Sequence, residues 1–130
     1  MKLIPVSQLQ EKGVRDFLKN VPQIQYRSLI RSGFILEVNS KIRGCFNLEK
    51  VTGDIYELRQ IYVITTDDIE IPLLFEMIIA LAKEFGAKEI WVNSHKLMID
   101  ILLEKLKFYP QKSKEHVKSS GKWWSYTISE

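Results

Sequence analysis

The sequence contains a single cysteine and two histidines, so several kinds of site have too few residues to form. Cys45 cannot form an intrachain disulfide, and it lies in the apolar stretch Ile42–Leu48, which favours a small core residue over a nucleophile. His95 and His116 lie in different segments without the spacing of metal ligands. We therefore expect neither a disulfide nor a metal site.

Long apolar runs are also missing. No run approaches the length that crosses a bilayer, and the first residues, Met1–Pro5, lack the apolar core of an export signal. We therefore expect no membrane partner and a cytoplasmic location. The 130 residues, 45% hydrophobic and 27% charged, suit a single soluble domain spanning residues 1–130.

Strong charge of one sign is missing as well, because the net charge is only +3. A charge this small does not by itself indicate nucleic acid as a partner. One basic stretch with neighbouring aromatic residues would suit single-stranded nucleic acid, but a solvated loop followed by a core strand is the simpler interpretation. Its residues are Lys105, Lys107, Lys112, Lys114, Lys118, Lys122, Trp123, Trp124 and Tyr126.

What the sequence does have is a strong strand followed by an apolar helix. Ile55–Val63 is rich in β-branched and aromatic residues and is expected to be a central strand. A polar turn precedes a helix over Leu73–Phe85, with Pro72 in its first turn and Gly86 ending it. This helix should be covered by protein on nearly every side. Its charged residues are Glu76, Lys83 and Glu84.

The remaining elements complete a mixed α/β sheet. Three consecutive strands form an antiparallel meander, and the strand Lys88–Asn93 follows a helical crossover, so it is expected to pair parallel to the central strand. Met98 and its apolar neighbours repeat at helical spacing and are expected in the core. The other expected elements are a helix Gln8–Leu18 capped by Ser7, a helix Gln23–Arg31, a hairpin Gly33–Val38 and Ile42–Leu48, a turn Val51–Asp54, a helix Lys96–Leu106 and a strand Trp123–Ile128.

Three stretches carry a likeness to a known family. Gly33–Cys45 looks like an opening hairpin, Glu57–Val63 like a fourth strand, and Leu103–Phe108 like the end of a last helix, in an element order that spans the whole chain. Together they resemble the GNAT (N-acetyltransferase) superfamily. The resemblance implies a GNAT-like α/β fold, with a mixed, mainly antiparallel, twisted sheet and helices on both faces.

The resemblance also implies acetyl-CoA as cofactor. In the family the backbone of the fourth strand pairs with the pantetheine arm, which places Ile61, Tyr62 and Val63 at the cofactor. A Gly-rich loop then binds the pyrophosphate, and here that loop falls on Asp68–Leu73, which has neither the basic residue nor the small ones. Pro72 removes one amide donor, and the acidic residues add like charge, so we expect weakened cofactor binding. The acids also have a simpler role as caps of the helix.

Glu57 is the one residue that the resemblance marks as catalytic. It lies where several members of the superfamily place the general base that takes a proton from the acceptor amine. The alternative role is an ion pair with Arg59, two residues along the same strand face. The tyrosine that commonly protonates the leaving thiolate corresponds to Leu103, and the nearby Tyr109 is expected to pack.

Two functions follow from these observations. The first is a GNAT-like acyl-CoA-dependent N-acyltransferase that moves an acetyl group to an amine on a small molecule or a protein. The second is a catalytically inactive GNAT-fold module for binding or dimerisation. Edge strands near either end would allow a homodimer, but nothing in the pattern requires one.

Overall fold

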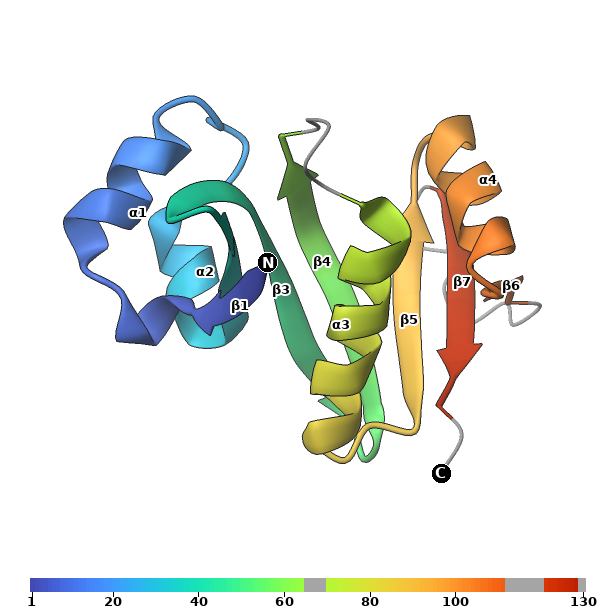
Figure 1. Cartoon of the computed structure of the whole chain (residues 1–130). Helices are drawn as coiled ribbons and strands as arrows, with labels where there is room; N and C mark the ends of the chain where they lie inside the picture. The colour runs from blue at the N-terminus through green and yellow to red at the C-terminus, as the bar shows by residue number, and fades with distance from the viewer. Residues whose placement is uncertain (65–69, 112–120, 129–130) are drawn as a thin grey trace. The chain divides into compact units, whose positions relative to one another are not determined.

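The computed structural model describes residues 1–64, 70–111 and 121–128 (Figure 1). Its seven strands form one sheet in the order β1-β2-β3-β4-β5-β7-β6. In chain order the elements are β1 (Lys2–Pro5), the 3₁₀ helix η1 (Val6–Gln8), α1 (Glu11–Leu18), α2 (Tyr26–Ser32), β2 (Gly33–Val38), β3 (Lys41–Thr52), β4 (Ile55–Val63), α3 (Ile71–Glu84), β5 (Glu89–Ser94), α4 (Leu97–Lys105), β6 (Tyr109–Pro110) and β7 (Lys122–Thr127).

The chain divides into two compact units, which are described in turn. Unit 1 comprises Met1–Glu49 and Arg59–Leu74, and unit 2 comprises Lys50–Leu58 and Phe75–Glu130. Strands β3 and β4 and helix α3 each contribute residues to both units.

Unit 1 is built on antiparallel strands β1, β2 and β3, with α1 and α2 beside them (Figure 1). The hairpin between β2 and β3 turns at Asn39 and Ser40, whose φ angles of 52° and 65° match the twist of the flanking strands. Ile35 and Cys45 are register partners and point into the same buried cluster as the helix residues Val14 and Leu29. Helices α1 and α2 therefore cover the face of the hairpin that carries Ile35 and Cys45.

Unit 2 contains the parallel pair of strands. Ile55–Leu58 of β4 pair with Glu89–Val92 of β5, β5 pairs antiparallel with β7, and β7 pairs antiparallel with β6. Phe108 links the core of this unit, because its ring lies 6.2 Å from that of Phe75 on α3 and 5.1 Å from that of Tyr126 on β7.

Several predictions from the sequence are confirmed. The bounds of β2 and β4 are those expected, β4 and β5 run parallel, and the sheet is mixed and mainly antiparallel. Pro72 lies in the first turn of α3, where its missing N–H costs no internal hydrogen bond. Gly86, with a φ of 86°, ends the helix, and the next amide, of Ala87, donates to the Ala82 carbonyl at 3.0 Å.

The first helices differ from the prediction. Ser7 lies in η1 and does not cap α1, which begins after Gln10 without a side-chain cap. Helix α2 begins at Tyr26, after the expected start, and β3 continues to Thr52 into the expected turn. The short edge strands β1 and β6 were not expected, because strands of 4 and 2 residues are too short to show an alternating pattern.

The expected coverage of the two later helices is wrong in part. Helix α3 leaves Leu73 42% exposed, together with Glu76 and Ala80 on the same side, so its outer face is open. On α4, Met98 is 80% and Ile101 47% exposed, although both were expected in the core. Both helices carry apolar residues on nearly every side, but the rest of the protein covers only some of those sides.

Candidate functional site

Glu57 lies on β4 in register with Trp91 of β5 and is half-buried. Register partners on neighbouring strands point to the same face, so the Trp91 indole lies beside Glu57. Trp91 in turn packs edge-on against Trp123 at 6.2 Å, while Leu58 points to the opposite face and is 4% exposed. The surface around Glu57 is therefore aromatic. The sequence did not mark Trp91 as part of a site, and it marked Trp123 only in the basic stretch considered for nucleic acid.

Ile61, Tyr62 and Val63 form the end of the same strand and are half-buried. They follow Gln60, which has a φ of 52°, a backbone conformation uncommon outside glycine and often found at functional sites. The cofactor role of these three residues and the catalytic role of Glu57 stay predictions.

Gly44 of β3 allows the end of β4 to lie close to β3. A Cβ atom at this position would lie 2.5 Å from the Tyr62 carbonyl oxygen, so only glycine fits. The Ile64 amide also donates to the Arg43 carbonyl at 2.7 Å, just beyond the end of β4. Because of these contacts, β3 fixes the backbone of the strand end to which the sequence assigns the cofactor.

The segment expected at the pyrophosphate is described only from Glu70 onward, since residues 65–69 lie outside the described residues. The Glu70 carbonyl accepts a hydrogen bond from the Leu74 amide at 3.0 Å, which makes Glu70 the residue preceding the helix. Pro72 follows two residues later and has no amide hydrogen to donate. The start of α3 thus offers a ligand fewer free amides than an ordinary helix start.

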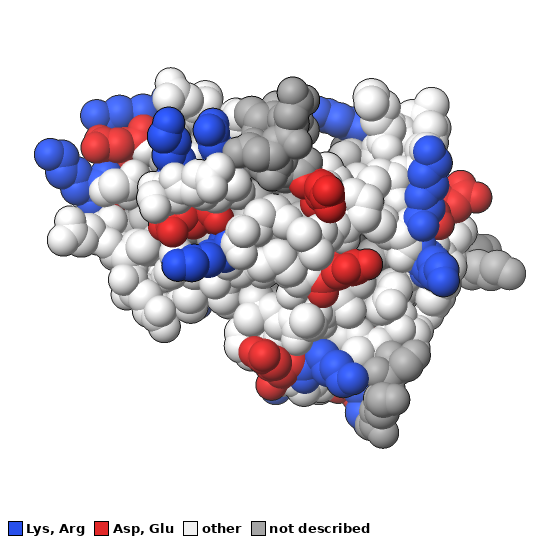
Figure 2. Space-filling view, viewed as in Figure 1, with Lys and Arg blue, Asp and Glu red and all other residues white. Residues whose placement is uncertain are grey.

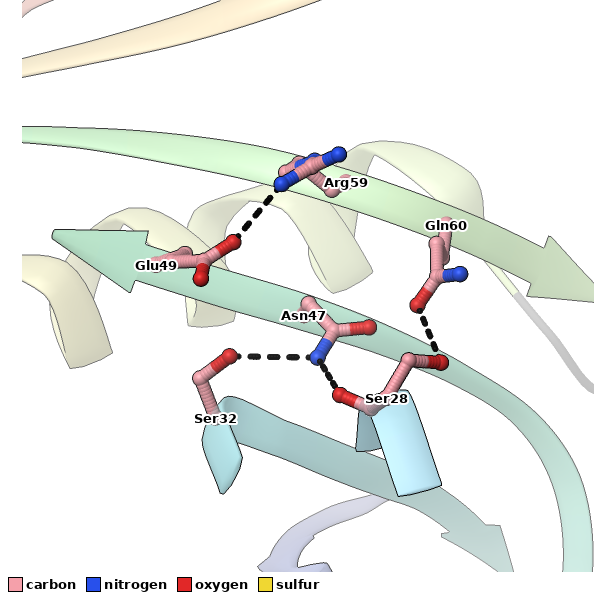
Figure 3. A network of polar contacts seen from close by, with 6 residues as sticks. All are labelled: Ser28, Ser32, Asn47, Glu49, Arg59 and Gln60. Atoms are coloured by element: carbon pink, nitrogen blue, oxygen red, sulfur yellow. Dashed lines mark hydrogen bonds and ion pairs between the residues drawn. The ribbon is translucent and has the colours of Figure 1, made fainter. Parts of the chain in front are cut away.

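A polar pocket of about 140 Å³ lies within unit 1, and Figure 3 shows polar contacts of most of its lining residues. We call it the Asn47 pocket. Asn47 is 3% exposed, and its Nδ2 donates to the Ser28 carbonyl at 2.9 Å and to Ser32 Oγ at 3.1 Å. Ser28 Oγ lies 3.1 Å from Gln60 Oε1. The residues that line the pocket are Ser28, Arg31, Asn47, Glu49, Arg59 and Gln60.

Arg59 forms an ion pair in this pocket. Its Nη1 lies 2.9 Å from Glu49 Oε2, with the two side chains 53% and 44% exposed. A pair this exposed contributes little to stability, so its main effect is to orient the guanidinium. The ion pair of Arg59 with Glu57, expected as the alternative role of Glu57, stays a prediction.

Leu103 and Tyr109 are the two residues that the sequence relates to protonation of a leaving thiolate. Leu103 is fully buried in α4 and has no proton to give. Tyr109 is 47% exposed in β6, and its hydroxyl lies 2.5 Å from Thr127 Oγ1. Tyr109 is therefore an edge residue tied to β7 by a hydrogen bond and is less packed than expected.

Cys45 is 1% exposed, and burial raises the pKa of its thiol to about 12. At pH 8 roughly one thiol in ten thousand would be ionised, so native protein should not react with a chromogenic disulfide reagent within an hour. The same reagent should label Cys45 fully in denaturant. Rapid labelling of native protein would contradict the core position of Cys45.

The described residues have neither a metal-binding cluster nor a membrane-spanning helix. Among the described residues no group of His, Cys, Asp and Glu side chains could hold a metal ion, and none of the helices there is long and apolar enough to span a membrane. Figure 2 shows basic and acidic side chains interspersed on the face in view. Trp124 is 2% exposed and bonds to Asp100, so it is a core residue; Lys112, Lys114 and Lys118 lie outside the described residues.

Comparison of sequences gives no match for this chain, whereas comparison of structures gives several. No family model matches the chain, and no curated protein matches it. The structure is similar to that of an aminoglycoside 6'-N-acetyltransferase from Enterococcus faecium, with a TM-score of 0.69 and 11% sequence identity. The match covers 100% of this chain and 98% of that one. A GNAT-family acetyltransferase from Staphylococcus aureus has a TM-score of 0.67 and 12% identity, over 98% and 99%.

A further similar structure is a longer protein. N-acetylglutamate synthase from Neisseria gonorrhoeae, complexed with coenzyme A and N-acetyl-glutamate, has a TM-score of 0.71 and 13% identity. The match covers 99% of this chain but only 35% of the synthase, so the chain spans about a third of that protein's length.

Proposed function

The chain has the fold of the GNAT acetyltransferases, and from this premise we propose that it is an acyl-CoA-dependent N-acyltransferase that moves an acetyl group to an amine. The observation that carries the proposal is the agreement of the fold with acetyltransferases along 98% or more of the chain. Because the sequence identity is only 11–13%, this agreement shows the fold alone, and the activity is inferred from the fold together with the residues of the site.

The residues of β4 fit part of the cofactor and the start of α3 does not fit the rest. The backbone at Ile61–Val63 is extended and half-buried, so its N–H and C=O groups suit hydrogen bonds to the amides of a pantetheine arm. Acetyl-CoA would supply this arm and an activated thioester. Pro72 and the acidic residues before it disfavour a pyrophosphate. We therefore expect a weaker affinity than an intact phosphate loop would give.

Glu57 is the proposed general base. As the new C–N bond forms and the C–S bond breaks, the acceptor amine loses a proton, and the Glu57 carboxylate accepts it directly or through water. Leu103 supplies no proton for the leaving thiolate, so that proton comes from solvent. Positioning of the amine against the thioester would provide most of the rate enhancement.

The acceptor belongs to the class of amines on small molecules or proteins. The similar synthase was crystallised with N-acetyl-glutamate and, in a second structure, with L-arginine. These neighbours favour a small-molecule acceptor for this chain.

A catalytically inactive GNAT-fold module is the second candidate. The start of α3 favours it, because Pro72 takes an amide away from the position where the family binds pyrophosphate. Such a module would keep the fold for binding or for pairing with a second copy.

Thermal unfolding with acetyl-CoA separates the two candidates. Acetyl-CoA at about 100 times its dissociation constant adds roughly 2.7 kcal/mol to the free energy of unfolding, which raises the melting midpoint by several degrees. We expect such a rise at millimolar acetyl-CoA, but not with ATP at the same concentration. We also expect release of free CoA thiol when a panel of amines is added. Absence of both effects would favour the inactive module.

A further inference from the structure

The Asn47 pocket holds a buried polar atom that has no partner in the described part of the chain. Asn47 Nδ2 donates to the Ser28 carbonyl, which can only accept, so the orientation of the side-chain amide is fixed. Asn47 Oδ1 is then the remaining acceptor, and it has no hydrogen-bond partner among residues 1–64, 70–111 and 121–128. Because Asn47 is 3% exposed, bulk solvent does not readily supply a donor to this oxygen.

The direction of this oxygen connects it to the pocket. In Figure 3 Asn47 Oδ1 points away from Ser32 and toward the side where Gln60 lies. Ser28 Oγ donates to Gln60 Oε1 at 3.1 Å, and both residues line the pocket with Asn47. A group bound in the pocket with an N–H or O–H would complete the hydrogen bonds of Asn47.

The charges around the pocket favour an anion beside that donor. The lining residues include two guanidinium groups, of Arg31 and Arg59, and one carboxylate, of Glu49, which lies 2.9 Å from Arg59. Arg31, at the end of α2, has no ion-pair partner among the described residues and is exposed. The pocket therefore carries a net positive charge, which suits a carboxylate.

The size of the pocket limits the ligand further. Its volume of about 140 Å³ is below the range of roughly 300–1,000 Å³ typical of sites for drug-sized ligands. It suits a polar headgroup whose remainder extends outward. A headgroup that combines an N–H donor with a carboxylate within this space is that of a free α-amino acid.

We propose that the Asn47 pocket binds the ammonium and carboxylate groups of a free α-amino acid. The ammonium donates to Asn47 Oδ1 and lies near the Glu49 carboxylate, and the carboxylate binds to Arg31. Amino acids are then the acceptor class of the acyltransferase, a statement that rests on the proposed function. Binding itself requires no cofactor.

Calorimetric titration of the full chain with L-alanine, in the absence of acetyl-CoA, tests the proposal. We expect saturable binding, weakened at least about tenfold when either acetate or methylamine replaces L-alanine, since each presents only half of the headgroup. Inorganic phosphate binding as tightly as L-alanine would overturn the proposal. So would a lack of saturation at tens of millimolar L-alanine.

Two variants on one helix provide the matched comparison. Arg31→Met should weaken L-alanine binding about tenfold or more, because it removes the guanidinium group proposed to bind the carboxylate. Arg27→Met, one turn earlier on α2 and outside the pocket lining, should leave the affinity unchanged. Asn47→Leu should abolish binding. If the Asn47→Leu variant does not fold, Arg31→Met still tests the proposal. Equal losses in Arg27→Met and Arg31→Met would contradict the pocket.

The two proposals fail in different ways. If L-alanine binds but is not acetylated in the presence of acetyl-CoA, the pocket stands and the acyltransferase function fails. If amines without a carboxylate are acetylated and L-alanine does not bind, the acyltransferase stands and the amino-acid pocket fails.

Discussion

Replacing Glu57 by glutamine is expected to lower kcat for acetyl transfer by about 10²–10⁴-fold. Glutamine keeps the size of the side chain on β4 beside Trp91 but cannot accept the proton of the acceptor amine. The KM for acetyl-CoA should change little, because the proposed cofactor residues, Ile61–Val63, are untouched. Initial rates of CoA release at saturating acetyl-CoA measure the effect.

The control for this variant is Glu104→Gln. Glu104 is an exposed glutamate on α4, and its replacement should leave kcat unchanged. A melting midpoint of Glu57→Gln within a degree or so of the native value would show that the fold is retained. Turnover by Glu57→Gln equal to that of the native chain would remove Glu57 from the mechanism.

Phe46→Ala is expected to lower the free energy of unfolding by about 3–5 kcal/mol. Phe46 is 1% exposed on β3, and its ring stacks on that of Phe34, its register partner on β2, at 5.4 Å. Alanine removes the buried surface and leaves a cavity that the two paired strands cannot close. Urea denaturation followed by tryptophan fluorescence measures the loss.

A second apolar residue of the same strand is the control. Val51 is 46% exposed, so Val51→Ala should change the free energy of unfolding by no more than about 0.5 kcal/mol. A loss below about 1 kcal/mol in Phe46→Ala would contradict the packing described for β2 and β3.

The central strands of the fold could be predicted from the sequence because their pattern is local. Ile55–Val63 and Gly33–Val38 carry enough β-branched and aromatic residues to fix both ends. The exposure of Met98 and Ile101 could not be predicted, since helical spacing shows which residues share a side and not how much of that side is covered. Coverage depends on the neighbours that the whole fold brings to the helix.

The candidate site divides in the same way. Glu57 and Ile61–Val63 could be named because they belong to one continuous strand. The Asn47 pocket could not be named, because Asn47 lies 19 residues from Ser28, and Ser28 lies 32 residues from Gln60. Nothing local in the sequence marks these as partners, and the left-handed backbone of Gln60 likewise has no sequence signal, since glutamine has no special preference for it.

Gly44 has a consequence for anyone who redesigns this chain. A library of random substitutions near the proposed cofactor residues would vary residue 44 freely, since a glycine contributes no functional group. Even alanine there would displace the Tyr62 carbonyl oxygen, which would lie 2.5 Å from the added methyl group, from its place near the end of β4. Libraries that alter acyl-donor preference should therefore keep this position constant and vary the residues that follow Val63.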